Sequence, residues 1–353
     1  MKIYNHILSF LVLVAIFTSC TKEQQRKLSS APIAIAKSNE IVVISDRKLW
    51  MAPLKDSIEY HLAAPFLILP QPEPIHDLRH FTVEELKEEP LRKQLRTYLI
   101  LADLDDKTSP ATQMVLKDLD RLLGDKKANS ITVGKNKWAR GQIIMYLVGH
   151  GEKELMENFR KSYPAITNKV AQFDRKQIEK NAYVMGNNNT IKSVIQEKFG
   201  FELPIPSPYK IAIKDDNFLW IRSDYKALNS NILIHKLPYK EKNQLTADYL
   251  KSLINKIGKK YITTDVKGSF MQLNDRDLPF LTQVTKINDK YALEGKGIWE
   301  IENDFMGGAL ASYLVLNEKT NTLTLLVGFI HAPSKKKRDF MQHIEAVLRK
   351  PEF

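Results

Sequence analysis

The chain has 353 residues, of which 43% are hydrophobic and 27% are charged, with a formal net charge of +12 and one cysteine. This apolar content excludes intrinsic disorder and predicts one large domain or two packed ones. A single cysteine excludes an intrachain disulfide, a cysteine-ligated zinc site and an iron–sulfur cluster.

The first twenty residues predict an export signal. Lys2 supplies positive charge, and an unbroken apolar run follows over residues 7–17, which is shorter than the roughly 20 residues that span a bilayer. The run ends in Phe17-Thr18-Ser19-Cys20, which resembles a bacterial lipobox. The resemblance implies that residues 1–19 are a lipoprotein signal peptide and that Cys20 is lipidated. An ordinary cleaved signal or an uncleaved anchor is the alternative.

Residues 20–39 are expected to form the lipidated cysteine and a flexible tether, since they are polar and show no helical apolar stripe. The folded part would therefore work close to a membrane surface. Because only Glu23 supplies an acid just after Cys20, we expect a cell-envelope location, at the outer membrane and facing the periplasm.

A first half is predicted over residues 40–203. Thr82 and Glu85 have the spacing of a capping box, Pro164 should kink or divide a helix, and Gly200 should end one. Strands are expected over 40–45, 98–104 and 142–148, and helices over about 55–63, 82–96, 109–123, 152–173 and 190–199.

A second half is predicted over residues 204–353 and is richer in strands. A two-residue turn at Asn288-Asp289 should join one hairpin, and a last helix should run from Ser334 to Lys350. The class is α+β, a mainly antiparallel sheet with helices layered on it. The even spacing of Trp50, Trp138, Trp220 and Trp299 allows two similar halves.

Several segments together resemble one family, the uncharacterised Bacteroidetes lipoproteins of domain of unknown function 4837. They are Leu69-Pro70-Gln71-Pro72-Glu73-Pro74, Trp138-Ala139-Arg140-Gly141-Gln142, Gly297-Ile298-Trp299-Glu300, Asp304-Phe305-Met306-Gly307-Gly308 and Gly328-Phe329-Ile330-His331-Ala332-Pro333. The resemblance covers about residues 40 to 350. It implies a lipid-anchored envelope protein and no particular reaction or ligand.

The chain contains no sequence motif of a known catalytic mechanism, so no catalytic residue, metal or cofactor is expected. His76 and His80 have a metal-ligand spacing on a helix, but the nearby Pro74 favours an extended segment. His150 lies at a strand-to-helix turn, where either a catalytic group or an ordinary polar residue could stand.

Two places are candidates for contact with a ligand or partner. Trp138, Arg140 and Gln142 could hold a carbohydrate or an anionic headgroup, or Trp138 could be buried while Arg140 reaches water. Trp299 and Asp304 precede the two glycines 307 and 308, where a tight corner or close backbone approach is the alternative.

Four cations, Lys335, Lys336, Lys337 and Arg338, are predicted to open the last helix. They are misplaced there, because the helix N-terminus is itself positive. They could instead contact anionic lipid or an acidic partner, or they could be a solvated helix end.

The sequence therefore predicts a lipid-anchored envelope protein that acts as a non-catalytic binding or assembly module. An enzyme acting on an envelope glycan or lipid is the alternative. The expected partners are the membrane, through the anchor, and an envelope protein or anionic lipid. Nucleic acid is not expected despite the net charge, because an exported protein meets little of it.

Overall fold

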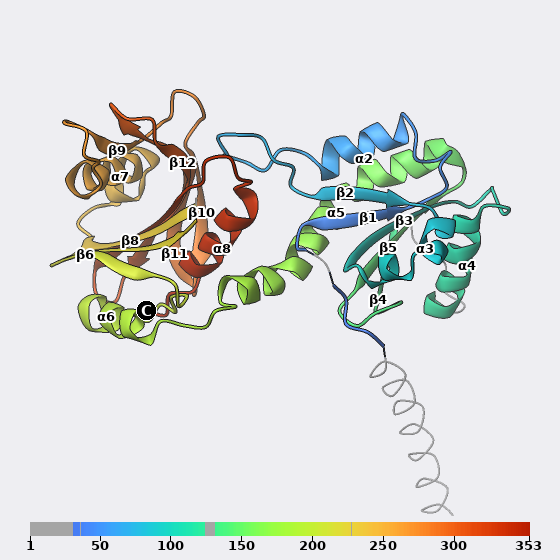
Figure 1. The fold of residues 1–353 in the computed structure, drawn as a ribbon, viewed down its shortest axis with the longest axis horizontal. Helices are drawn as coiled ribbons and strands as arrows, with labels where there is room; N and C mark the ends of the chain where they lie inside the picture. Colours follow the sequence, from blue (N-terminus) through green and yellow to red (C-terminus); the bar gives the residue numbers. More distant parts are fainter. Residues whose placement is uncertain (1–30, 36, 124–130, 227) are drawn as a thin grey trace, which may run out of the picture. The chain divides into compact units, whose positions relative to one another are not determined.

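A computed structural model describes residues 31–35, 37–123, 131–226 and 228–353 (Figure 1). The chain forms two compact units. Unit 1 contains the described residues up to Ala64 together with His76–Phe173, and unit 2 contains Pro65–Ile75 and Asp174–Phe353. The sequence placed the boundary at residue 203, whereas unit 2 begins at Asp174 and also takes the earlier segment 65–75.

Unit 1 is built on a five-stranded sheet of order β2-β1-β3-β5-β4, in which β4 alone is antiparallel to its neighbour. Side chains of β1 and β3 alternate between two cores. One core packs against α2 and α5, and the other against α3 and α4. Strands buried on both faces are expected to be apolar throughout. The elements are β1 (Glu40–Ile44), α2 (Leu54–Leu62), β2 (Asp77–Phe81), α3 (Val83–Glu88), a 3-10 helix (Pro90–Gln94), β3 (Thr97–Asp103), α4 (Pro110–Leu123), β4 (Ile131–Lys135), β5 (Ile143–Gly149) and α5 (Gly151–Ala182).

Unit 2 is built on an antiparallel sheet of order β10-β11-β12-β13-β8-β7-β6, with β9 paired to β11. Alternate residues of β12 face two cores, one with α6 and α8 and the other with α7. The elements are α6 (Asn189–Phe199), β6 (Lys210–Asp215), β7 (Phe218–Tyr225), β8 (Leu228–Pro238), a 3-10 helix (Lys242–Leu245), α7 (Ala247–Tyr261), β9 (Phe270–Leu273), β10 (Leu281–Ile287), β11 (Lys290–Glu302), β12 (Gly307–Asn317), β13 (Thr322–His331) and α8 (Arg338–Leu348).

The predicted α+β class, mainly antiparallel, is confirmed. Eight of the eleven pairings between named strands are antiparallel, and the three parallel ones all lie in unit 1. The two sheets differ in strand order and direction, so the even spacing of the tryptophans does not reflect two similar halves. Among the residues described, every helix is too short or too polar to cross a lipid bilayer.

Local signals in the sequence decide where several helices begin and end. Thr82 and Glu85 form the expected capping box, and Gly200 ends α6 with a φ of 75°. Pro164 does not divide α5, which runs on to residue 182. The last helix begins at Arg338 and not at Ser334, because Ser334 adopts a left-handed φ of 61° that cannot lead into a helix.

Candidate functional site

The carboxyl ends of the parallel strands of unit 1 meet at one edge of its sheet. In open sheets of this kind ligands bind at this edge, where the strand order reverses. Here the reversal lies between β1 and β3, because the strand order continues to β2 on one side and to β5 on the other. Asp46 follows β1, Asp103 ends β3, and Asp105 and Asp106 follow it. We call these four residues the acidic edge.

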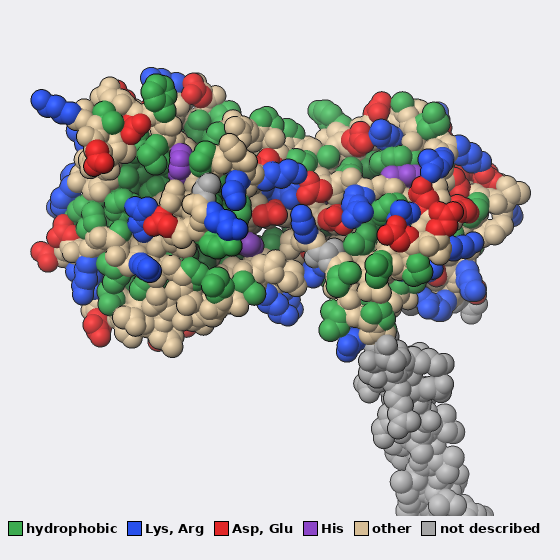
Figure 2. Space-filling model, viewed as in Figure 1, with side chains coloured by type: hydrophobic (Ala, Val, Ile, Leu, Met, Phe, Trp, Pro, Cys, Tyr) green, Lys and Arg blue, Asp and Glu red, His purple; other side chains and the backbone are tan. Residues whose placement is uncertain are grey.

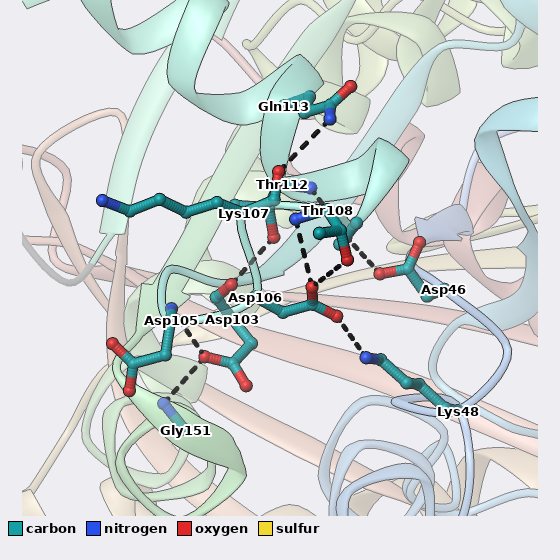
Figure 3. Close-up of polar contacts among 11 residues, drawn as sticks. Asp46, Lys48, Asp103, Asp105, Asp106, Lys107, Thr108, Thr112, Gln113 and Gly151 are labelled. Atoms are coloured by element: carbon teal, nitrogen blue, oxygen red, sulfur yellow. Dashed lines mark hydrogen bonds and ion pairs between the residues drawn. The ribbon is translucent and has the colours of Figure 1, made fainter.

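The side chain of Asp103 ties the end of β3 to the start of α5 (Figure 3). Its Oδ1 accepts hydrogen bonds from the main-chain N–H of Asp105 at 3.0 Å and of Gly151 at 2.8 Å. Gly151 is the first residue of α5 and has a φ of 78°, which suits glycine. The carboxylate therefore orders two loops that are distant in the sequence.

Asp106 makes a second set of contacts in the same loop (Figure 3). Its Oδ1 accepts from the N–H and the hydroxyl of Thr108, at 3.1 and 2.7 Å, and its Oδ2 pairs with the ammonium of Lys48. Lys48 and then Thr108 lower the pKa of Asp106 to about 2. Asp106 is therefore an anion at every physiological pH.

Asp46 and Asp105 complete the acidic edge. Asp46 accepts a hydrogen bond from the hydroxyl of Ser109, whose oxygen in turn accepts the N–H of Thr112 at 3.0 Å in the first turn of α4. Asp105 is exposed and lies 2.7 Å from Nδ1 of His150. The hydrogen bond to Asp105 and its charge raise the pKa of His150. All four acids are thus fixed by neighbouring groups.

This arrangement can bind a cationic group. Acidic side chains gather over this end of unit 1, on a chain whose net charge is +12 (Figure 2). Asp106, whose pKa is lowered, is a poor proton donor at neutral pH. The other three carboxylates contact main-chain N–H, hydroxyl or imidazole groups, so the geometry suits charge recognition better than general acid catalysis. In the described ranges no three His, Cys, Asp or Glu side chains are grouped to hold a metal ion.

The predicted cluster Trp138, Arg140 and Gln142 lies in unit 1 and does not converge. Trp138 packs on the core, edge to face with Tyr98 at 4.9 Å. Gln142 is buried, and it accepts from two main-chain N–H groups and donates to two carbonyls just before β3. Arg140 is exposed. Gly141, with a φ of 82°, interrupts the alternation that would have placed Arg140 beside Gln142.

Trp299 and Asp304 lie in unit 2, and both have structural contacts. Trp299 is buried, and its Nε1 donates to the carbonyl of Ile330 at 3.1 Å. A Cβ on Gly308 would lie 1.9 Å from the same carbonyl oxygen, so this glycine permits a close backbone approach. Asp304 accepts the N–H of Phe305 at 2.7 Å. The motif therefore forms a tight corner between β11 and β12.

The four predicted cations separate into two pairs. Lys335 and Lys336 are exposed. Lys337 and Arg338 are buried, and their main-chain N–H groups both donate to the carboxylate of Glu73. Burial removes Lys337 and Arg338 from any membrane-facing surface.

The remaining candidates have different outcomes. Cys20 lies outside the described residues. His76 precedes the strand β2 and His80 lies within it, so the two do not share a helix face. His150 lies at the turn between β5 and α5, as predicted, beside Asp105.

Sequence reasoning missed the acidic edge as a site. A signal was present in Asp103-Leu104-Asp105-Asp106, three acids directly after a buried strand. This run of acids indicates a site only if β1, β3 and β5 are known to be parallel. Parallel strands bring Asp46, which follows β1, and the start of α5, which follows β5, to the same edge of the sheet as the acids after β3. The hairpins of the second half favoured antiparallel pairing throughout.

Comparison with known proteins gives two family matches and several distant structural similarities. No curated protein matches the sequence. LpqN of Mycobacterium tuberculosis, described as involved in cell envelope biogenesis, has 12% identity over 43% of this chain and 82% of its own, with a TM-score of 0.27. The Ran-binding protein Mog1p of Saccharomyces cerevisiae has 11% identity over 43% and 89%, with a TM-score of 0.28. Human StAR-related lipid transfer protein 5 has 7% identity over 45% and 95%, with a TM-score of 0.21.

The family matches divide the chain in two. The model of the expected family, domain of unknown function 4837, matches residues 188–350. The segments 69–74 and 138–142, which also suggested this family, lie outside that range and within the second match, over residues 34–183. Residues 188–350 of this chain are similar to the family described as domain of unknown function 4837, and residues 34–183 to the one described as domain of unknown function 8532.

Proposed function

We propose that this chain is a lipid-anchored protein of the bacterial cell envelope, attached through Cys20 to the outer membrane and facing the periplasm. Its folded units bind or assemble partners and carry out no reaction of their own. The anchor is supported by the apolar run over residues 7–17 that leads to the single cysteine. Two or three acyl chains, at roughly 0.8 kcal/mol per buried CH₂, would hold the protein permanently.

The acidic edge is the observation that supports binding. Its carboxylates are fixed by main-chain N–H groups, Ser109, Lys48 and His150, and Asp106 stays ionised because its pKa is about 2. Carboxylates that are held by neighbouring groups recognise cations at a smaller cost of ordering side chains. The partner this surface fits is a segment of an envelope protein that carries lysine or arginine.

Membrane fractionation tests the anchor. Cys20→Ala should leave the protein unacylated and release most of it from the membrane fraction. The matched control is Ser19→Ala, which keeps the lipidated residue and should remain in the membrane. A wild-type protein that carries no acyl mass, with a variant equally membrane-bound, would contradict the anchor.

Crosslinking and capture from envelopes tests the binding surface. The double change Asp105→Asn and Asp106→Asn should remove the captured partner, and salt should weaken wild-type capture, because exposed charges are screened. Asp120→Asn is the control, since it removes an exposed charge elsewhere on unit 1. Equal capture by all three proteins would show that the acidic edge is not the binding surface.

A further inference from the structure

The two edge strands of the unit 2 sheet are protected to different degrees. At one edge, β6 contains a register shift between Ile211 and Ile213, and it carries Lys210, Lys214 and Asp215. At the other edge, β10 pairs with β11 through seven residues without a break. Bulges and charges are the devices that keep an edge strand from pairing with another chain. In the part of the chain that the structure describes, β10 has one charged residue and no bulge.

The turn that follows β10 indicates which main-chain groups face outward. Asn288 and Asp289 have φ values of 44° and 62°, the pattern of a two-residue type I′ turn. Such a turn is closed by a pair that exchanges hydrogen bonds, here Ile287 with Lys290. Bonded and non-bonded pairs alternate along an antiparallel ladder. The main chain of Thr282, Val284 and Lys286 therefore points away from β11.

Two side chains of β10 are apolar and exposed. Val284 is 66% exposed and Leu281 is 40% exposed. Lys286 supplies the only charge of the strand. A regular, exposed and apolar edge is a template for strand addition, in which an extended peptide gains main-chain hydrogen bonds along the strand.

An apolar pocket of about 470 Å³ lies at the start of β10. Its outer wall is the segment 65–75, which contributes Phe66, Leu67, Ile68 and Ile75. Leu67 is 65% exposed, and Ile68 adopts a φ of 63°, a strained conformation for a β-branched residue. The wall is held in place by the main-chain N–H of Phe66, which donates to the carbonyl of Glu73 at 2.6 Å, and by packing of Phe66 on the core.

The floor of this pocket is polar but neutral overall. Glu294 is buried, and it accepts from Tyr313 Oη and Arg349 Nη2, both at 2.7 Å. Burial opposes its ionisation, but Lys296, Tyr313, Gln283 and Arg349 together lower its pKa. Because Glu294 is already neutralised, the pocket has no charge to offer and suits an apolar side chain.

A second pocket, of about 630 Å³, lies at the other end of β10. Three lysines line it, against two acids, Asp289 and Glu318. Successive side chains of a strand point to opposite faces. Phe66 in the first pocket packs on the core shared with α6 and α8, whereas Tyr291 and Leu316 in the second pocket belong with the core shared with α7, so the pockets open on opposite faces of the sheet. The lysines are Lys286, Lys290 and Lys319.

We propose that β10 binds an extended segment of a partner protein by strand addition, with an aliphatic side chain in the first pocket and an acidic side chain in the second. The two side chains must lie an odd number of positions apart in the sequence, as at i and i+1 or i+3, because they enter opposite faces. This inference rests on the proposed function only in requiring a partner in the envelope. It concerns a different surface from the acidic edge and does not involve Cys20.

A synthetic peptide tests the proposal. The probe is a fluorescent peptide of about ten residues, mainly Thr and Val, with one Leu and one Glu an odd number of positions apart. It is titrated by fluorescence anisotropy against the full chain in detergent micelles. We expect saturable binding that weakens about tenfold or more when alternate peptide nitrogens are methylated, because methylation removes the main-chain donors. A probe with an even separation should also bind more weakly.

Variants of the full chain locate the site. Val284→Lys places a charge on the exposed edge and should weaken binding about tenfold, while Asp216→Lys, outside β10, should not. Lys286→Glu should reject the Glu peptide and accept a peptide with Lys in its place, which a misfolded variant could not do. The proposal is overturned if the even-separation peptide or the methylated peptide binds as tightly as the original probe. It is also overturned if the original probe shows no saturable binding up to about 1 mM protein. So would a wild-type dimer that Val284→Lys dissociates, since a second copy would then occupy β10.

Discussion

The carboxylate of Glu73 performs for α8 what an N-cap side chain performs for other helices. Lys337, at the N-cap position, has no side-chain capping hydrogen bond of its own. Glu73 is 7% exposed, and its two oxygens accept the main-chain N–H groups of Lys337 and Arg338, the second at 3.1 Å. Changing Glu73 should therefore destabilise α8 and the core beneath it.

The size of the effect depends on what replaces the carboxylate. Glu73→Gln keeps one acceptor and loses the charge at the positive end of the helix, which should cost about 1 kcal/mol. Glu73→Ala leaves two buried N–H groups without an acceptor, at about 1–3 kcal/mol each, so about 2–6 kcal/mol is expected.

Hydrogen exchange followed by mass spectrometry measures this directly. Exchange of the amides of residues 338–348 should accelerate about fivefold in Glu73→Gln and about 30-fold or more in Glu73→Ala, as the free energies above imply. Glu318→Gln removes a charge from an exposed turn of the same unit and should leave α8 unchanged. If Glu73→Ala exchanges at the wild-type rate in α8, the capping role is wrong.

Three further predictions concern single residues. Glu294→Gln should destabilise unit 2 by about 1–2 kcal/mol, because the buried hydroxyl of Tyr313 and the 41% exposed Arg349 would lose their carboxylate acceptor. The pKa of Glu294 is lower in the folded than in the unfolded protein. Its contribution to the free energy of unfolding is therefore present above the unfolded pKa and is lost as pH falls through the folded pKa. The urea midpoint of the wild type should accordingly fall in acid more than that of the variant. The pKa of His150 is higher in the folded than in the unfolded protein, so its contribution to stability is present below the unfolded pKa and is lost as pH rises through the folded pKa. An NMR titration should show this raised pKa, and Asp105→Asn should return it to the ordinary range of histidine. Gly308→Ala should prevent β12 from packing beside β13, because its Cβ would lie 1.9 Å from a carbonyl oxygen, and circular dichroism should show loss of cooperative unfolding.

Local elements could be predicted from the sequence because their signals are local. The capping box of Thr82, the end of α6 at Gly200 and the turn at Asn288-Asp289 each depend on a few neighbouring residues. The start of α8 could not be predicted, because Ser334 is a good N-cap by type but adopts a left-handed φ, and the acceptor that replaces it is Glu73. The direction of the unit 1 strands could not be predicted either, since buried parallel and antiparallel strands share the same apolar runs.

The segment 65–75 has a consequence for how the protein is made. Glu73 precedes Lys337, to which it is bonded, by 264 residues. At about 5–20 residues per second, a ribosome needs roughly 10–50 s to synthesise the chain between them. During that time the unit 2 core that Phe66 and Leu69 join is incomplete, because its last members lie on α8. The newborn chain therefore contains an apolar segment whose core is completed only by the last helix, and a chaperone that binds this segment would protect it until then.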